Sequence, residues 1–223
     1  MKQEHLNAPR RRALIASALK LPLILPLALT LAGCELAVPG QGPPPALYRL
    51  TPKSTFGEGL PVVDWQLVLE IPVADAGLST TRVALQMTPT QLEYYARSSW
   101  TDRAPLMVQT LMIESFENSG HIIAVGRESV GLRADYILKS ELREFQAEYF
   151  HGTLPSVRVA INAKLVKLPR RTIIGSESFE AMAEAKADTL NDIILAYDEA
   201  LGSVLKDLVA WTLTTGQDAI GDG

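Results

Sequence analysis

An alternation of apolar and polar residues near position 160, the clearest in the sequence, constrains the fold of this 223-residue chain more than any other feature. Apolar side chains stand at positions 157, 159, 161, 163 and 165, and polar side chains occupy most positions between and just after them. A period of two gathers the apolar side chains on one face of a β-strand. A turn is then predicted at Pro169-Arg170-Arg171, and the returning strand is predicted over residues 172–179. The sequence therefore predicts an antiparallel hairpin with one face buried and the other in water.

Further strands are predicted before this hairpin. Strand-like patterns occur over residues 46–50, 65–71, 81–87, 91–96 and 121–125. The short gap around Pro89 predicts that the third and fourth of these segments form a hairpin. Between residues 134 and 150 the apolar positions change phase, which predicts one long strand with a β-bulge near Arg143.

Two segments have the periodicity of amphipathic helices. The first is predicted over residues 102–118, with Asp102 as its N-cap and Gly120 just past its end. The second opens with a capping box over residues 189–192, and its apolar stripe continues to Trp211. Strands outnumber helices and are joined largely by short turns. The predicted fold is therefore α+β, with an antiparallel β-sheet and two principal helices packed on one of its faces.

Cys34 is the only cysteine, and it ends a Leu-Ala-Gly-Cys sequence that has the pattern of a bacterial lipobox. Three consecutive arginines and a short apolar stretch precede it, as in a secretory signal peptide. Pro22 and Pro26 argue against the alternative, a free cysteine behind an N-terminal anchor helix. We therefore expect cleavage between Gly33 and Cys34, with a diacylglycerol and a palmitate added at Cys34. Export by the general secretory route is expected, and the arginines leave the twin-arginine route open.

The chain accordingly divides into four parts. Residues 1–33 are the predicted signal peptide, and residues 34–46 are the lipidated cysteine and a flexible tether rich in proline and glycine. Residues 47–213 are the predicted domain, and residues 214–223 a flexible tail. A proline-rich tether is extended at about 3.1 Å per residue, so it could hold the domain roughly 25 to 35 Å from the lipid surface.

The charge of the chain after cleavage excludes one class of partner. Removal of residues 1–33 leaves 16 basic and 24 acidic residues, and therefore a net charge of −8. This composition excludes nucleic-acid binding and leaves membrane attachment to the acyl chains. Because the single thiol is expected to carry lipid, no intramolecular disulfide can form. Packing of the core must stabilise the fold.

The residues available for chemistry predict no catalytic site, no metal site and no cofactor. After the signal peptide the histidines are His121 and His151, which we interpret as solvated turn residues. Two histidines are too few for a zinc site of the usual kind. Glu141, Glu144 and Glu148 lie in a polar strand with basic neighbours, so surface ion pairs explain them. Neither a glycine-rich phosphate loop nor a nucleophile elbow occurs.

Three aromatic residues are candidates for a partner interface. Tyr94 and Tyr95 are neighbours on a predicted strand, so one of them must face away from the core. Trp100 follows in the loop before the first helix. Tyrosine and tryptophan are enriched at protein interfaces. The alternative is that all three cover the edge of the sheet.

Several segments share their order and spacing with a known family. They are Tyr48-Arg49-Leu50, the Leu-Glu-Tyr-Tyr-Ala-Arg-Ser-Ser-Trp sequence over residues 92–100, the segments 134–138 and 141–145, and the helix that ends at residues 208–211. In these segments the chain resembles the ABC-type transport auxiliary lipoproteins, the PqiC-like lipoproteins encoded with MCE-domain lipid transport systems. The resemblance covers residues 47–211. It includes no catalytic signature, and it carries no ligand residue over to this chain.

The resemblance implies a non-enzymatic, periplasm-facing lipoprotein that assists transport of phospholipid or related lipids between membranes and supports outer-membrane integrity. The implied partners are an MCE-domain protein and the permease and ATPase of an ABC transporter. Ring-like assembly into a homo-oligomer is a further expectation from the resemblance. Two alternatives stay open: a structural or regulatory envelope lipoprotein that does not contact lipid cargo, and, in last place, a lipid-cleaving enzyme.

The residue after Cys34 bears on which membrane would hold the lipid anchor. In well-studied enteric systems, an aspartate at this position retains a lipoprotein in the inner membrane. This chain has Glu35 there instead. We therefore expect the anchor to lie in the periplasmic leaflet of the outer membrane rather than in the inner membrane.

Overall fold

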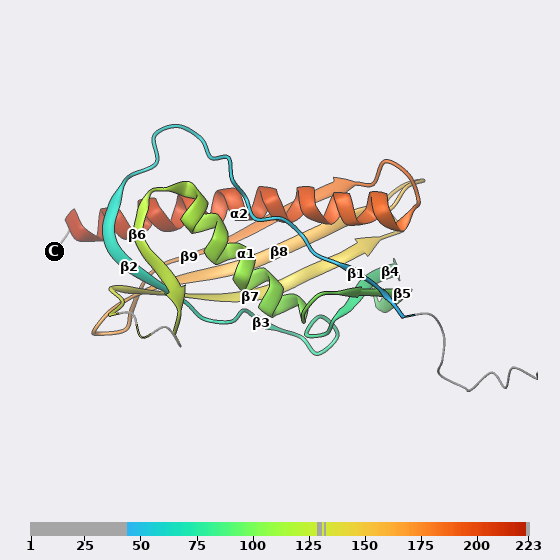
Figure 1. The fold of residues 1–223 in the computed structure, drawn as a ribbon, viewed down its shortest axis with the longest axis horizontal. Helices are drawn as coiled ribbons and strands as arrows, with labels where there is room; N and C mark the ends of the chain where they lie inside the picture. The colour runs from blue at the N-terminus through green and yellow to red at the C-terminus, as the bar shows by residue number, and fades with distance from the viewer. Residues whose placement is uncertain (1–43, 129–130, 132, 222–223) are drawn as a thin grey trace, which may run out of the picture. The chain divides into compact units, whose positions relative to one another are not determined.

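A computed structural model describes residues 44–128, 131 and 133–221, which form one mixed β-sheet and two long helices (Figure 1). The first strands are β1 (Ala46–Tyr48), β2 (Val63–Leu69), β3 (Val73–Ala74), β4 (Arg82–Thr88) and β5 (Gln91–Trp100). Helix α1 (Ala104–Ser119) and strand β6 (Ile122–Arg127) follow. The chain ends with β7 (Tyr136–Glu148), β8 (Ser156–Lys167), β9 (Thr172–Glu184) and helix α2 (Leu190–Gly221).

Strand β7 is the centre of the sheet. Three strands share one of its edges, and all three run parallel to it: β2 at residues 136–138, β3 at 141–142 and β4 at 147–148. Along its other edge β8 pairs antiparallel, and β9 pairs antiparallel with β8. Beyond β4 lie β5 and then β1, and beyond β2 lies β6. The two groups of strands, β1-β5-β4 and β2-β6, are therefore joined through β7.

The α+β class and the placement of both helices on one face are confirmed. Figure 1 shows α1 and α2 in front of the strands, and their buried residues belong to the same core cluster. The predicted hairpins are β4-β5 and β8-β9, and the predicted bulge lies between Leu142 and Glu144. A wholly antiparallel sheet is wrong, because β2, β3 and β4 run parallel to β7. Alternation identifies the buried face of a strand, but it does not identify the strand's neighbour or direction.

Helix α1 begins later than predicted and ends as predicted. Its N-cap is Arg103, whose side chain makes no capping hydrogen bond, and Pro105 lies in the first turn. Asp102 is not the N-cap; its carboxylate accepts a hydrogen bond from the Arg103 N–H at 2.7 Å. Gly120 ends the helix with φ of 65°, a left-handed conformation that glycine adopts readily.

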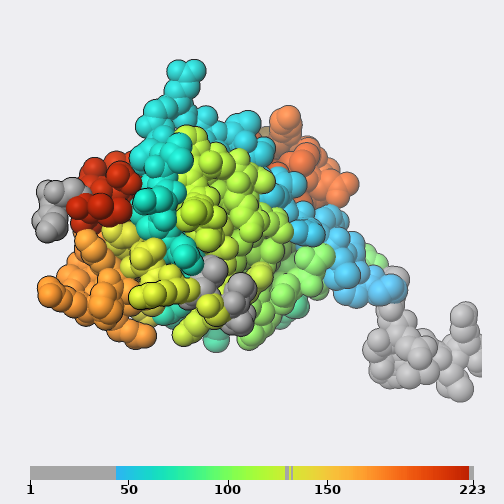
Figure 2. Space-filling view, turned by 60° about the vertical axis from the view of Figure 1, so that its left-hand side comes forward, coloured from blue at the N-terminus to red at the C-terminus, as the bar shows by residue number. Residues whose placement is uncertain are grey.

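Helix α2 is longer than predicted. The capping box is confirmed, since the Thr189 hydroxyl contacts the Asp192 carboxylate and accepts a hydrogen bond from the Asp192 N–H. Residues 214–221, expected to be part of a flexible tail, are helical. Two side chains of the sheet hold this last part: the Tyr136 hydroxyl donates to the Gly216 carbonyl at 3.0 Å, and the Lys167 ammonium donates to the Ala219 carbonyl at 2.7 Å. Figure 2 shows the C-terminal end of α2 beside β2 at this end of the molecule.

The main core lies between the sheet and the helices. At its centre the rings of Trp100, Phe145 and Tyr197 pack against one another with centroids 5.1 to 5.5 Å apart. The Tyr197 hydroxyl donates to the Ala84 carbonyl at 2.6 Å, which ties α2 to β4. On the other face of the sheet, a small separate cluster contains Val68, Ile137 and Val166. The helix-free face is otherwise largely polar.

Candidate interaction surface

The predicted site residues do not form one site. Gly33 and Cys34 lie outside the described residues, so the lipidation site stays a prediction. Trp100 belongs to the core: only 1% of it is exposed, and it cannot contact a partner while the protein is folded. Strand β5 continues through Trp100 instead of ending before it, and this extension carries the indole beneath α2. Its place in the proposed interface is therefore wrong.

Tyr94 and Tyr95 are half-buried, and each is held by a neighbour. The Tyr94 hydroxyl donates to the Gly77 carbonyl at 3.1 Å, and the Arg82 guanidinium lies 3.7 Å from the centroid of the Tyr94 ring. The Tyr95 hydroxyl donates to the Tyr149 hydroxyl at 3.0 Å. Both rings stabilise this end of the sheet. Only the exposed parts of the two rings could contact a partner.

Beside these tyrosines, β5 carries an irregularity that the sequence pattern did not reveal. Tyr94 pairs with Ala84, whereas Ser99 pairs with Arg82, so β5 has three more residues than β4 in this interval. Arg97 lies within it with φ of 54°, an unusual conformation for a residue other than glycine. The exposed Arg97 therefore lies beside β1, because Ala46 pairs with the neighbouring Ser98. This bulge lies where the described chain enters the sheet.

The half-buried phenols of Tyr95 and Tyr149 and the buried phenol of Tyr197 have raised pKa values. Burial raises the pKa of Tyr95 far above its ordinary value of 10.0, and the hydrogen bond with Tyr149 raises it further. Burial is also the largest cause of the raised pKa values of Tyr149 and Tyr197. Because the folded state disfavours the tyrosinate, the unfolded chain releases these protons first. The resulting stability is fully present below about pH 10 and is lost as the pH rises.

We therefore expect alkaline unfolding that begins above about pH 10 and coincides with tyrosine ionisation. The measurement is circular dichroism and tyrosinate absorbance on one pH series. In Tyr95→Phe, which lacks one of these three phenols, the dependence of the free energy of unfolding on pH should be shallower above pH 10. Tyrosinate absorbance that rises by its full amplitude while the circular dichroism is unchanged would contradict this explanation.

A polar network lies on the helix-free face of β7 and β8. The Gln146 amide donates to the carboxylates of Glu144 and Glu148 at 2.6 and 3.0 Å. The other Glu148 oxygen contacts His151 Nε2 at 2.5 Å. The expected surface ion pairs are confirmed for Glu141, which pairs with Arg143, but Glu148 is only 1% exposed. Its burial follows from its position, because the residue lies between strands β4 and β8 in the sheet.

Arg158 supplies the positive charge of this network. Burial lowers the pKa of Arg158, but the hydrogen bond and the charge of Glu180 outweigh burial, so the pKa lies above its ordinary value. The guanidinium lies 2.7 Å from Glu180.

Among the described residues, no hydroxyl or thiol is hydrogen-bonded to His151. The histidine and Glu148 therefore lack the nucleophile that a catalytic triad requires.

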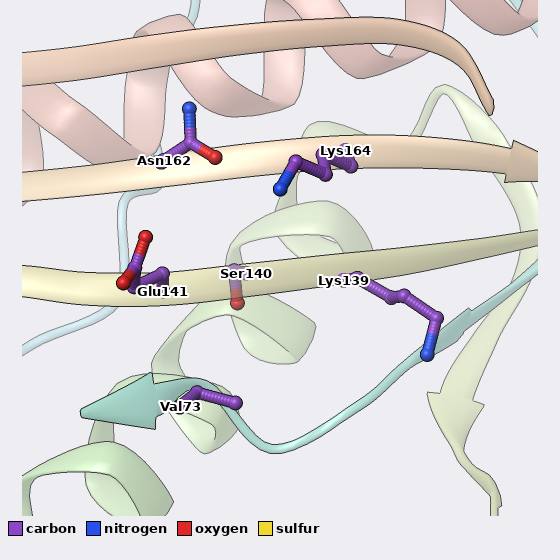
Figure 3. Close-up of a pocket in the computed structure, with 6 residues that line it drawn as sticks. All are labelled: Val73, Lys139, Ser140, Glu141, Asn162 and Lys164. Atoms are coloured by element: carbon purple, nitrogen blue, oxygen red, sulfur yellow. The ribbon is translucent and has the colours of Figure 1, made fainter.

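The depressions on the described surface are open and shallow, and charged residues form part of their lining. One of about 290 Å³ lies on the helix-free face and is shown in Figure 3. Lys139 and Lys164 project from neighbouring positions of β7 and β8, and Val73 of β3 lies below them. The Lys139 ammonium contacts both oxygens of Glu70 at 2.7 Å, so an ion pair already neutralises it. A depression of this kind does not enclose an acyl chain.

His121, predicted to be a solvated turn residue, is half-buried between α1 and β6. Its Nδ1 atom is buried and has no hydrogen-bond partner among the described residues. Within residues 44–128, 131 and 133–221, no group of three or more histidine, cysteine, aspartate or glutamate side chains could hold a metal ion. In the same part of the chain, no helix combines the length and the apolar character needed to cross a membrane.

Solved structures resemble this fold. Protein XCC0632 from Xanthomonas campestris has a crystal structure that superposes with a TM-score of 0.75 and 30% sequence identity, over 79% of this chain and 99% of that one. A second crystal structure, of an uncharacterized protein, gives a TM-score of 0.56 with 12% identity, over 81% of this chain and 100% of that one. The second likeness shows the fold alone.

Sequence comparisons agree with the structural ones. Uncharacterized protein bll6063 from Bradyrhizobium diazoefficiens is 28% identical over 189 residues, which is 82% of this chain. The chain spans about half of that relative, 49% of its length. The family described as ABC-type transport auxiliary lipoprotein component matches residues 48–209, from β1 to the middle of α2. The chain belongs to this family of ABC-type transport auxiliary lipoproteins.

Proposed function

We propose that the chain is a non-enzymatic lipoprotein of the outer membrane, facing the periplasm, that assists an ABC transporter with an MCE-domain partner in moving phospholipid or related lipids. The observation that carries this proposal is the family match over residues 48–209, placed directly behind the lipobox at Cys34. The anchor would fix the domain to a membrane, and the domain would bind other components of the system.

The structure supports a binding role over a carrier role. Most of the large apolar side chains in the described part of the chain lie in a closed core between the sheet and the helices, where they contact one another. The depression in Figure 3 is open and partly lined by charged residues, and so is a second depression beside Glu70, Arg127 and Glu128. A lipid carrier needs an apolar cavity instead. Lipid would therefore pass through a partner, and this domain would position or brace that partner.

Deletion of the gene, with complementation, tests the proposal. Loss of the protein should expose phospholipid in the outer leaflet of the outer membrane, and an MCE-domain protein should co-purify with the complemented chain. Unchanged outer-membrane asymmetry together with no such partner would favour the alternative, a structural or regulatory envelope lipoprotein that does not touch lipid cargo. Tyr94→Ala and Tyr95→Ala are the variants to compare, since Trp100 is needed for folding.

Replacement of Cys34 tests the lipid anchor separately from the role of the domain in transport. Cys34→Ser removes the thiol that accepts lipid, so the protein should move from the membrane fraction to the soluble fraction or persist as an uncleaved precursor. A single acyl chain binds membranes only marginally, so loss of all acyl chains should release the domain almost completely. Membrane fractionation and mass spectrometry of the N-terminus measure both outcomes. Glu35→Asp, which keeps the thiol, should stay membrane-bound. Retention in the membrane of a Cys34→Ser protein whose signal peptide has been removed would contradict the lipid anchor.

A further inference from the structure

Strand β9 is an open edge of the sheet. In the described part of the chain it pairs with β8 alone, and Figure 1 shows it at the margin of the sheet behind α2. The strand has 13 residues, from Thr172 to Glu184. Proteins usually protect such an edge with charged side chains, most often lysine, with proline or with a very short strand. The charged residues of β9 are all glutamates. Strand β9 contains neither lysine nor proline and is among the longest strands described.

The backbone groups that point to this open edge can be identified. The Ala185 N–H donates to the Pro155 carbonyl at 2.9 Å, so residue 185 faces β8. Neighbouring residues of a strand direct their N–H and C=O groups to opposite edges, and the pairing with β8 is regular from Gly175 to Glu184. The residues whose backbone groups face outward are therefore Ser176, Ser178, Glu180, Met182 and Glu184.

The side chains along this edge favour a particular partner. Glu177, Glu180 and Glu184 are all exposed, and of these Glu180 alone has an ion-pair partner among the described residues, Arg158. Met182 is 48% exposed and provides an apolar contact. A second copy of β9 would place another three carboxylates against these, which costs energy. A strand with basic residues would neutralise them instead.

We propose that the free edge of β9 binds an extended, lysine- or arginine-rich segment of another protein, which adds one strand to the sheet. Backbone hydrogen bonds to the outward-facing groups supply the affinity, and Glu177, Glu184 and Met182 supply the preference for basic and apolar side chains. The partner's chemistry follows from β9 itself and holds whichever cargo the transport system moves.

Hydrogen exchange tests the proposal with synthetic peptides. The protein is the full-length mature chain purified from membranes in detergent. Glu177 and Glu184 are seven residues apart in β9, so their side chains lie on opposite faces of the sheet. The probe is therefore a peptide of about ten residues in which pairs of lysines alternate with pairs of valines, so that both faces of the added strand carry lysine. The matched peptide has glutamate at each lysine position. With the lysine peptide, exchange should slow by about tenfold or more at the amides of Ser176, Ser178, Glu180 and Met182. The amides of the residues between them already face β8 and should change little.

Two variants test the charge and the backbone separately. The charge reversal Glu177→Lys with Glu184→Lys should weaken binding of the lysine peptide by roughly tenfold at low salt and strengthen binding of the glutamate peptide. Its control, Glu58→Lys with Glu117→Lys, makes the same change of net charge at exposed sites away from β9 and should leave the affinity within about twofold. Met182→Pro removes an outward N–H and should abolish binding without breaking a bond to β8.

Three results would overturn the proposal. The first is equal affinity of the protein for both peptides, and the second is exchange that the lysine peptide slows only at amides outside β9. The third is protection of β9 amides that rises with protein concentration when no peptide is present. The last result would identify a second copy of the chain as the occupant. If Met182→Pro fails to fold, the exchange pattern and the charge reversal still decide between these outcomes. Neither depends on lipid transport, so a failed deletion phenotype leaves this test intact.

Discussion

Replacing Trp100 with alanine should destabilise the domain by about 3 to 5 kcal/mol, the usual cost of deleting a buried aromatic side chain. The indole is 1% exposed, and it packs against Phe145 and Tyr197 at centroid distances of 5.5 and 5.1 Å. Its removal leaves a cavity where β5, β7 and α2 meet. In a domain of this size the melting temperature should fall by roughly 10 °C or more. Urea unfolding followed by circular dichroism measures the free energy.

Trp100→Phe is the matched control. Phenylalanine keeps an aromatic ring between the same neighbours, and it removes the indole N–H, which has no hydrogen-bond partner among the described residues. The loss should therefore stay below about 2 kcal/mol. If Trp100→Ala instead leaves the free energy of unfolding unchanged, Trp100 is not a core residue, and its assignment to a partner interface regains its basis.

Two glycines of the same helix should respond to alanine in opposite directions. A Cβ atom on Gly216 would lie 2.6 Å from Cζ2 of Trp65, a side chain that is 3% exposed. Trp65 in turn packs edge-on against Tyr136, with ring centroids 4.9 Å apart, so it has little room to move. Overpacking of this kind costs about 1 to 3 kcal/mol and outweighs the gain of roughly 1 kcal/mol from the better helix former. Gly216→Ala should therefore be destabilising.

Gly202→Ala should be neutral or stabilising by up to about 1 kcal/mol. At this position the nearest atom to an added Cβ is Cδ of Lys53 at 4.0 Å, an ordinary contact with a flexible side chain. Both substitutions change the unfolded chain equally, so the difference between the two free energies of unfolding isolates the contact with Trp65. Equal effects of the two substitutions would show that the end of α2 does not pack on Trp65.

The sequence predicts local features of this fold better than distant ones. The capping box at Thr189, the end of α1 at Gly120 and the bulge after Leu142 were all predicted, because each depends on residues close together in the chain. The parallel pairing of β2 with β7 was not predicted, since Leu67 and Tyr136 are brought together from distant parts of the chain. A strand's own alternation contains no information on that partner.

The surface residues were predicted less well for the same reason. Trp100 is followed by polar residues in the sequence, which suggests a loop, yet its burial depends on Tyr197 from α2. Glu148 is a charged residue in a strand with polar neighbours, so the sequence predicted that it is solvated, yet β4 and β8 flank it on both sides. The open edge of β9 could be identified only after its single neighbour was known. The absence of proline and lysine over Thr172–Glu184 was the available signal.

The position of β7 determines when the domain can form as the chain is made. Strands β1, β5 and β4 pair with one another, and β2 pairs with β6, but the two groups meet at β7. During synthesis from the N-terminus, the chain therefore contains two unconnected sheet fragments, each with open edges. They can be joined only after residue 148 has been synthesised. The last helix then closes the core. Vectorial folding of this domain should thus be a late and cooperative event, and a chain stopped before β7 should be a substrate for chaperones and proteases.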